Sequence, residues 1–112
     1  MSTAIGRQAE AAAAAFLEYK GCTVVAQNWR TPRCEIDVVA ERDGTLYICE
    51  VKYRATRNQG AGLDYITPKK LAQMRFAARC FMHAHAWQGP VSLCAIEVSG
   101  PHFQVTAAVT DL

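Results

Sequence analysis

The dipeptide Asp43-Gly44 separates two stretches in which apolar and polar residues alternate, Cys34–Glu41 and Thr45–Tyr53. An Asp-Gly pair between such stretches is among the strongest short signals for a two-residue β-hairpin turn, because both turn positions require positive φ angles. A two-residue turn places Arg42 opposite Thr45 and thereby determines every other pair along the two strands. The sequence therefore predicts an antiparallel strand pair with a defined register.

Helices are expected before and after this hairpin. The first spans residues 3–20, with Ser2 or Thr3 as the N-cap and Gly21 as the left-handed stop. The second runs from Thr67-Pro68 to about His85, because Thr is a good N-cap and Pro suits the first helical turn. Helical spacing predicts two buried stripes, which are Ile5, Ala9, Ala12, Phe16 and Leu17, then Leu71, Met74, Ala78 and Phe81.

Three further strands are predicted, with a glycine-bearing loop between the hairpin and the second helix. The strands are Cys22–Trp29, Val91–Val98 and Phe103–Val109, and the loop is Ala55–Tyr65. The resulting order, α-β-β-β-α-β-β, predicts an α/β or α+β fold with helices packed on a sheet. A length of 112 residues is typical of one domain, so residues 1–112 are expected to form a single unit.

The composition excludes several classes of protein. Half of the residues are hydrophobic and a fifth are charged, which excludes a disordered or collagen-like chain. The longest apolar run, Ala11–Leu17, has seven residues, whereas a membrane span needs ~20. The five cysteines show no Cys-x-x-Cys pair, so neither a disulfide framework nor a zinc site is predicted. We therefore expect a cytoplasmic protein with reduced cysteines and no membrane partner.

The hairpin register brings charged residues together on one face. Asp37 is expected opposite Glu50, and Glu35 opposite Lys52, on the same face as Val39 and Ile48. The other face receives three apolar pairs, Ile36/Val51, Val38/Cys49 and Ala40/Tyr47. A three-residue turn would shift the pairing by one residue and separate Asp37 from Glu50.

Two carboxylates directly opposite one another repel, so a sheet tolerates the pair when a positive charge lies beside it. A divalent cation is one candidate, because Mg²⁺ takes one or two carboxylates and keeps waters for a phosphate substrate. Such a metal lowers the pKa of a bound water, and a nearby lysine can orient that water. The alternative is an ordinary salt bridge, with Lys52 neutralising Asp37 or Glu35.

Asp37, twelve intervening residues and then Glu50-Val51-Lys52 resemble the core of PD-(D/E)XK nucleases. Nearly the whole chain resembles the YraN-like family of small uncharacterised bacterial proteins, which belongs to that fold. The matching segments, in order, are Gly6-x-x-x-Glu10, Asn28-Trp29-Arg30, Glu35-Ile36-Asp37, Glu50-Val51-Lys52-x-Arg54, Gly60 and Lys69. Two positions depart from the family pattern: Cys34 replaces a glycine, and Ser92-Leu93-Cys94 replaces Arg-Phe-Asp.

This resemblance implies a restriction-endonuclease-like fold, a mixed sheet flanked by helices. It implies that Asp37, Glu50 and the main-chain carbonyl of Val51 bind Mg²⁺ or Mn²⁺. It further implies that Lys52 serves the attacking water and that Glu10 approaches the site from the first helix. The structural alternative for Glu10 is a glutamate favoured by the helix dipole.

The segment between Lys52 and Arg79 has seven basic residues and one acidic residue, which favours a polyanionic partner. The residues expected to contact nucleic acid are Arg30, Arg54, Arg57, Lys69, Lys70 and Arg75. For each one alone, a solvated surface position is the simpler interpretation. Trp29 could stack on a base, although a Trp that ends a strand usually packs against the core.

These features favour a metal-dependent nuclease that hydrolyses DNA phosphodiester bonds, with structured repair or recombination intermediates as one substrate class. One alternative is a non-catalytic nucleic-acid-binding or adaptor protein on the same fold, and another is an interaction module for a protein partner. Joint retention of Asp37, Glu50 and Lys52 favours the enzyme. A chain this small offers limited surface to hold a duplex, so a homodimer is a further expectation.

Overall fold

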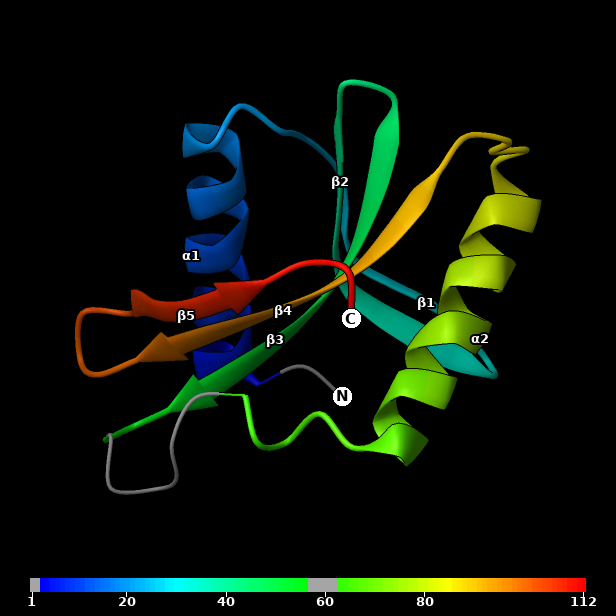
Figure 1. Cartoon of the computed structure of the whole chain (residues 1–112). Coiled ribbons are helices and arrows are strands. Elements are labelled where there is room, and N and C mark those ends of the chain that lie inside the picture. Colours follow the sequence, from blue (N-terminus) through cyan, green and yellow to red (C-terminus); the bar gives the residue numbers. More distant parts are fainter. Residues whose placement is uncertain (1–2, 57–62) are drawn as a thin grey trace.

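The computed structural model describes residues 3–56 and 63–112 and contains a five-stranded sheet between two helices (Figure 1). Helix α1 spans Ala4–Tyr19 and helix α2 spans Pro68–Ala84. The strands are β1 (Thr23–Thr31), β2 (Cys34–Arg42), β3 (Thr45–Arg54), β4 (Val91–Ser99) and β5 (Gln104–Val109). The order α-β-β-β-α-β-β confirms the predicted mixed α/β class.

The strands are arranged in the sheet in the same order as in the chain, β1-β2-β3-β4-β5. Strands β1, β2 and β3 form an antiparallel meander, whereas β4 lies parallel to β3 and β5 antiparallel to β4. The parallel pair requires a crossover, and α2 supplies it. The sheet is therefore mixed, as expected.

Local sequence signals explain where the elements begin and end. Asp43 and Gly44 have φ angles of 51° and 81°, the combination of a type I′ hairpin turn. The Thr3 hydroxyl accepts a hydrogen bond from the Gly6 N–H at the start of α1, and Thr67 accepts one from Lys70 at the start of α2. Gly21 follows α1 with φ 92°, the left-handed conformation that ends many helices.

The two helices cover opposite faces of the sheet (Figure 1). The cluster under α1 includes Ala13 and Leu17 with Val38 and Cys49. The cluster under α2 includes Met74 and Phe81, which pack against the opposite face of the sheet. The predicted stripe of α2 lies against the sheet, whereas Ile5 at the start of α1 is 52% exposed and the prediction for that residue was wrong. It lies in the first turn, where α1 has no buried residue.

Alternation along β2 breaks at Asp37. Val38 packs in the α1 cluster, but Ile36, two residues earlier, packs in the α2 cluster with Val39. The prediction that Ile36 shares a face with Val38 and Ala40 was therefore wrong. In the partner strand, Asn28 has φ 56° between the pairs Gln27↔Val38 and Trp29↔Ile36, and the register of the two strands shifts earlier, between Val24 and Ala26. The reversal of Ile36 thus occurs without a shift in register between these two pairs.

No helix in the described part of the chain is long and apolar enough to cross a membrane.

Candidate active site

The site forms where β2 and β3 stop pairing. Their register runs from Arg42↔Thr45 to Val38↔Cys49, which confirms the predicted hairpin register over this length. One step further, the Oδ2 atom of Asp37 accepts a hydrogen bond from the Val51 N–H at 2.8 Å. A side chain thus satisfies the backbone of β3 where the ladder ends, and this contact holds Asp37 beside the Glu50-Val51 segment.

Asp37 lies in a half-buried position next to other carboxyl groups. The pKa of Asp37 is raised from 3.8 to about 7, chiefly by burial and also by the negative charges of Glu10 and Glu35. The Val51 N–H lowers this pKa, because it stabilises the carboxylate. At neutral pH the group is therefore poised between its acid and its carboxylate form.

Glu10 reaches Asp37 from α1, on the side opposite to α2. The two carboxyl groups are within hydrogen-bonding contact, and burial raises the pKa of Glu10. The structure thus brings together two residues that lie 27 positions apart in the sequence. Helix α1 begins at Ala4 and has no acidic residue in its first turn, so the helix dipole does not explain Glu10, which is half-buried against Asp37.

Glu50 lies on the face of β3 toward α2. Its Oε2 atom is 3.2 Å from the Nζ atom of Lys70, with 22% of the Glu50 side chain and 33% of the Lys70 side chain exposed. Burial raises the pKa of Glu50, the charge of Asp37 raises it further, and Lys70 lowers it. Lys70 therefore neutralises Glu50, whereas the salt-bridge alternative placed Lys52 beside Asp37 or Glu35.

Lys52 is exposed, two residues after Glu50 on β3. It lines a cavity of about 380 Å³ together with Glu50, Tyr65 and Gln73. Within residues 3–56 and 63–112, Lys52 forms no ion pair. Its ammonium group thus faces the same open space as the Glu50 carboxylate.

The donor set suits a hard divalent cation. Two carboxylates and a main-chain carbonyl provide oxygen ligands of the kind that Mg²⁺ and Mn²⁺ prefer. Burial and mutual repulsion disfavour the anionic forms of Asp37 and Glu50, and a bound cation would relieve both effects. In the described part of the chain, no group of three or more His, Cys, Asp or Glu side chains is arranged as a metal site.

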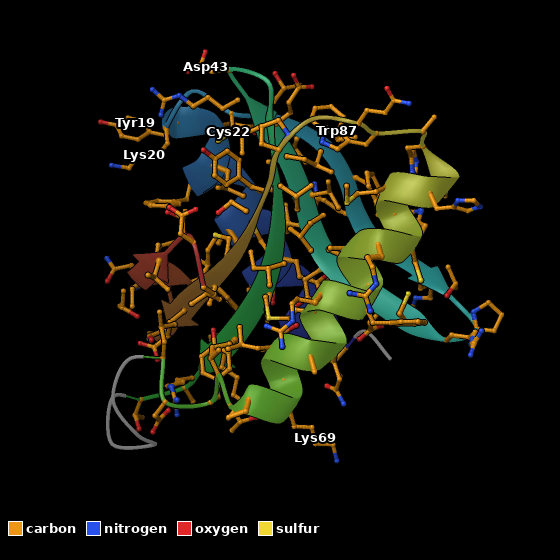
Figure 2. The ribbon with its side chains drawn as sticks, turned by 45° about the vertical axis from the view of Figure 1, so that its right-hand side comes forward. Tyr19, Lys20, Cys22, Asp43, Lys69 and Trp87 are labelled. Carbon is orange, nitrogen blue, oxygen red and sulfur yellow. The ribbon has the colours of Figure 1, made fainter. Side chains whose placement is uncertain are left out.

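The predicted nucleic-acid contacts divide into several groups. Lys69 and Lys70 line the cavities beside Glu50, and Lys69 projects outward from the first turn of α2, far from the Asp43 turn (Figure 2). Arg30 is exposed at the end of β1 and donates to the Asn28 side chain. Arg75 lines a different cavity beside β4 with Asp111, away from Glu50. Arg57 lies outside the described residues.

Arg54 is a correction to the predicted phosphate contacts. Its guanidinium group is buried, with Nε 2.6 Å from the Glu97 carboxylate and a second ion pair to Asp64. Glu97 also accepts a hydrogen bond from Thr106 at 2.9 Å. Arg54 therefore joins β3, β4, β5 and the segment before α2 and is not placed to meet a phosphate.

Trp29 is packed rather than presented to a base. Its ring lies edge-on to Phe81 at a centroid distance of 5.2 Å and near His85 at 6.0 Å. The packing interpretation of this residue is therefore the one that the structure supports.

Three residues that line the cavities beside Glu50 were not predicted from the sequence. Tyr65 lines the cavity beside Lys52, and burial raises its pKa. Gln73 and Phe76 line a second cavity, of about 550 Å³, that also borders Glu50 and Lys69. Helical spacing from Lys69 could have identified both residues. Tyr65 lies in a loop without periodicity, so no sequence pattern could have identified it.

Comparison with known proteins places these residues in a family. Residues 9–107 match the model of "Uncharacterised protein family UPF0102". A UPF0102 protein of Kineococcus radiotolerans is 38% identical over 100 residues, 88% of this chain and 82% of the relative. A UPF0102 protein of Neisseria meningitidis is 33% identical over 96 residues, 85% of this chain and 84% of the relative.

Other relatives extend beyond the matched region. A UPF0102 protein of Prosthecochloris aestuarii is 44% identical over 78 residues, 70% of this chain, but the match spans only 61% of that relative. The matched family region includes Glu10, Asp37, Glu50 and Lys52. The chain therefore belongs to the uncharacterised protein family UPF0102, the YraN-like family that its motifs resemble.

Proposed function

We propose that this protein is a Mg²⁺- or Mn²⁺-dependent nuclease that hydrolyses phosphodiester bonds in DNA. One observation carries the proposal: Asp37 is bonded to the Val51 N–H where β2 and β3 separate, so that its charge acts on Glu50, with Glu10 in contact with Asp37. Half-buried, mutually repelling carboxyl groups are costly to the fold, and they cluster at functional sites. The cations Lys52 and Lys69 lie beside the same carboxylate and provide the charge that a phosphate needs.

Each residue has a role that its position supports. Asp37, Glu50 and the Val51 carbonyl would hold the metal, which would supply an activated water and stabilise charge on the phosphate. Lys52 orients the attacking water or neutralises charge that develops on the phosphate. Glu10 positions Asp37 through the contact between their carboxyl groups and shares a proton with it when no metal is bound.

The ion pair between Glu50 and Lys70 supports a second candidate. A carboxylate that already has a cationic partner can be stable without a metal, as in a non-catalytic nucleic-acid-binding or adaptor protein. The two candidates differ in whether Asp37 and Glu50 bind a metal together. Metal binding and turnover therefore need separate measurements.

The first experiment is incubation of the purified protein with Mn²⁺ and single-stranded, duplex, flapped and four-way DNA. The test variant is Asp37→Asn/Glu50→Gln, which removes two charges and keeps the side-chain shapes. The matched control is Glu18→Gln/Asp43→Asn, which removes two charges at exposed positions. We expect cleavage by the native protein and the control, and none by the test variant or in EDTA.

The outcomes separate the two candidates. If no DNA is cut and calorimetry detects no Mn²⁺ binding that the test variant abolishes, the metal site is wrong and the adaptor takes first place. Cleavage that persists in the test variant would assign the activity to another site or to a contaminant.

We also propose that the protein holds a duplex as a homodimer, because one copy has principal extents of only 40 × 30 × 25 Å. Sedimentation of the protein with and without DNA tests this. A monomer at high concentration under both conditions excludes the dimer.

A further inference from the structure

A cavity of about 550 Å³ opens next to Glu50, between the first two turns of α2 and the start of β2. Helix α2 contributes Lys69, Ala72, Gln73 and Phe76, whose spacing puts them on one helix face. The strand side contributes Arg33, Cys34 and Glu35. The volume lies within the ~300–1,000 Å³ typical of small-molecule sites.

The charges in this cavity leave two cations for a ligand. Lys70 is paired with Glu50 at 3.2 Å, and Glu35 has Arg30 at 4.0 Å. Arg33 and Lys69 form no ion pair within residues 3–56 and 63–112. A ligand that brings a negative charge would therefore meet Arg33 and Lys69 without displacing an existing ion pair.

The walls also offer an aromatic surface and an amide. The Arg33 guanidinium lies 5.8 Å from the centroid of the Phe76 ring, so a cation and an aromatic ring are adjacent at the mouth. Met74 adds an apolar wall, and the Gln73 amide can both donate and accept hydrogen bonds. Apolar walls, an amide and cations together match the base and the phosphate of a nucleotide.

The cavity adjoins the catalytic carboxylate. Glu50, Lys69, Lys70 and Gln73 line both this cavity and the smaller one that contains Lys52. The two cavities thus meet at Glu50, one toward the start of β2 and one toward Lys52. A strand passing across Glu50 would have space for a nucleotide on each side of the phosphate to be cut.

We propose that the larger cavity holds one unpaired nucleotide of the substrate, beside the phosphate positioned at Glu50. This inference rests on the nuclease function proposed above and names its substrate class, which is DNA with a single-stranded segment. A base inside a duplex is covered by its neighbours on both faces and by its partner on its edge. Only an unpaired base can stack on an aromatic side chain in a pocket of this kind.

The test is fluorescence anisotropy of the full-length protein with a labelled single-stranded oligonucleotide and with the corresponding duplex, in EDTA so that nothing is cut. We expect tighter binding of the single strand. Phe76→Leu keeps an apolar side chain but removes the ring, and we expect it to weaken single-strand binding about tenfold. Arg33→Gln and Lys69→Gln should each lower the slope of log K against log salt by ~0.7.

The control variant is Arg79→Gln, which removes an exposed cation of α2 that lines a different cavity. It should leave the preference for single strands unchanged. Thermal melting of each variant identifies any loss of fold. Because Arg33 and Lys69 are exposed, their variants test the cavity even if Phe76→Leu does not fold.

Equal affinity for single strand and duplex overturns the inference. It is also overturned if the variants at Phe76, Arg33 and Lys69 bind the single strand as tightly as the Arg79→Gln control does. Cleavage in Mn²⁺ judges the proposed function separately. A protein that cuts duplex and single strand equally keeps the nuclease and loses the cavity assignment. A protein that binds single strands through Phe76, Arg33 and Lys69 but cuts nothing loses the nuclease and keeps the nucleotide site.

Discussion

The carboxylate of Asp37 accepts the Val51 N–H at 2.8 Å and replaces a main-chain acceptor at the point where β2 and β3 separate. The same contact keeps Asp37 next to the main chain between Glu50 and Val51. Burial nevertheless disfavours the charge on this carboxyl group. The ionised form of Asp37 therefore lowers the free energy of unfolding at neutral pH. Four predictions follow from this position and its surroundings.

Asp37→Asn should stabilise the protein at about pH 8, by up to ~4 kcal/mol in the free energy of unfolding. The pKa of Asp37 is about 7 in the folded protein against 3.8 as its ordinary value. The stability contributed by the protonated carboxyl is thus complete below about pH 4 and is lost as the pH rises to about 7. An asparagine keeps an oxygen for the Val51 N–H and carries no charge.

Urea denaturation near pH 4 and near pH 8 measures this effect. The gain should be present at the higher pH and absent at the lower one. A variant less stable than the native protein at both values would show that the Asp37 charge is not costly.

Affinity for Mn²⁺ should rise with pH, by up to ~10-fold per pH unit below pH 7, because the metal must displace a proton from Asp37. The groups that face this carboxyl are Glu10 from α1 and Glu35 within β2, whose negative charges raise its pKa, and Glu50 from β3, whose own pKa the charge of Asp37 raises. Calorimetry of metal binding across this range checks the slope. The Glu18→Gln/Asp43→Asn control should show the same slope as the native protein, and a flat profile would contradict the prediction.

Lys70→Met should strengthen Mn²⁺ binding near pH 8 by ~2- to 5-fold, because the ammonium group beside Glu50 competes with the metal. The Nζ atom of Lys70 lies 3.2 Å from Glu50, whereas the exposed neighbour Lys69 forms no ion pair within the described residues. Lys69→Met is therefore the matched control and should change the affinity less. Weaker metal binding in Lys70→Met would show that Lys70 supports the site instead of competing for it.

Arg54→Met should lower the Tm by ~5 °C or more, because it leaves the buried Glu97 carboxylate without its cation. Lys52→Gln, on the same strand but exposed, should leave the Tm unchanged and abolish cleavage. Calorimetric melting and the cleavage assay together separate the two roles. An unchanged Tm for Arg54→Met would return Arg54 to the candidate phosphate contacts.

The local features of this chain follow from its sequence because they depend on neighbouring residues. The Asp43-Gly44 turn needs two positive φ angles, which these residue types tolerate, and the register follows from the turn as far as Val38↔Cys49. The ends of both helices follow from Thr3, Gly21 and Thr67 for the same reason. These contacts span three to five residues, so sequence spacing is enough to identify them.

The arrangement of the site depends on contacts between distant segments. Ile36 packs on the α2 face although Val38 packs on the α1 face, and simple alternation along β2 cannot predict this reversal. Likewise, the sequence does not show whether Lys52 or Lys70 pairs with a carboxylate of the site. The packing of α2 brings Lys70 to Glu50.

The sequence by itself determined the element order, the hairpin register and the candidate residues Asp37, Glu50 and Lys52, because turn chemistry and periodicity act over short distances. Tertiary structure alone decided that Glu10 contacts Asp37, that Lys70 neutralises Glu50 and that Arg54 is buried with Glu97. The physical reason is that a charged side chain is neutralised by whichever group packing brings nearest. That group here lies on another helix or strand, far away in the sequence.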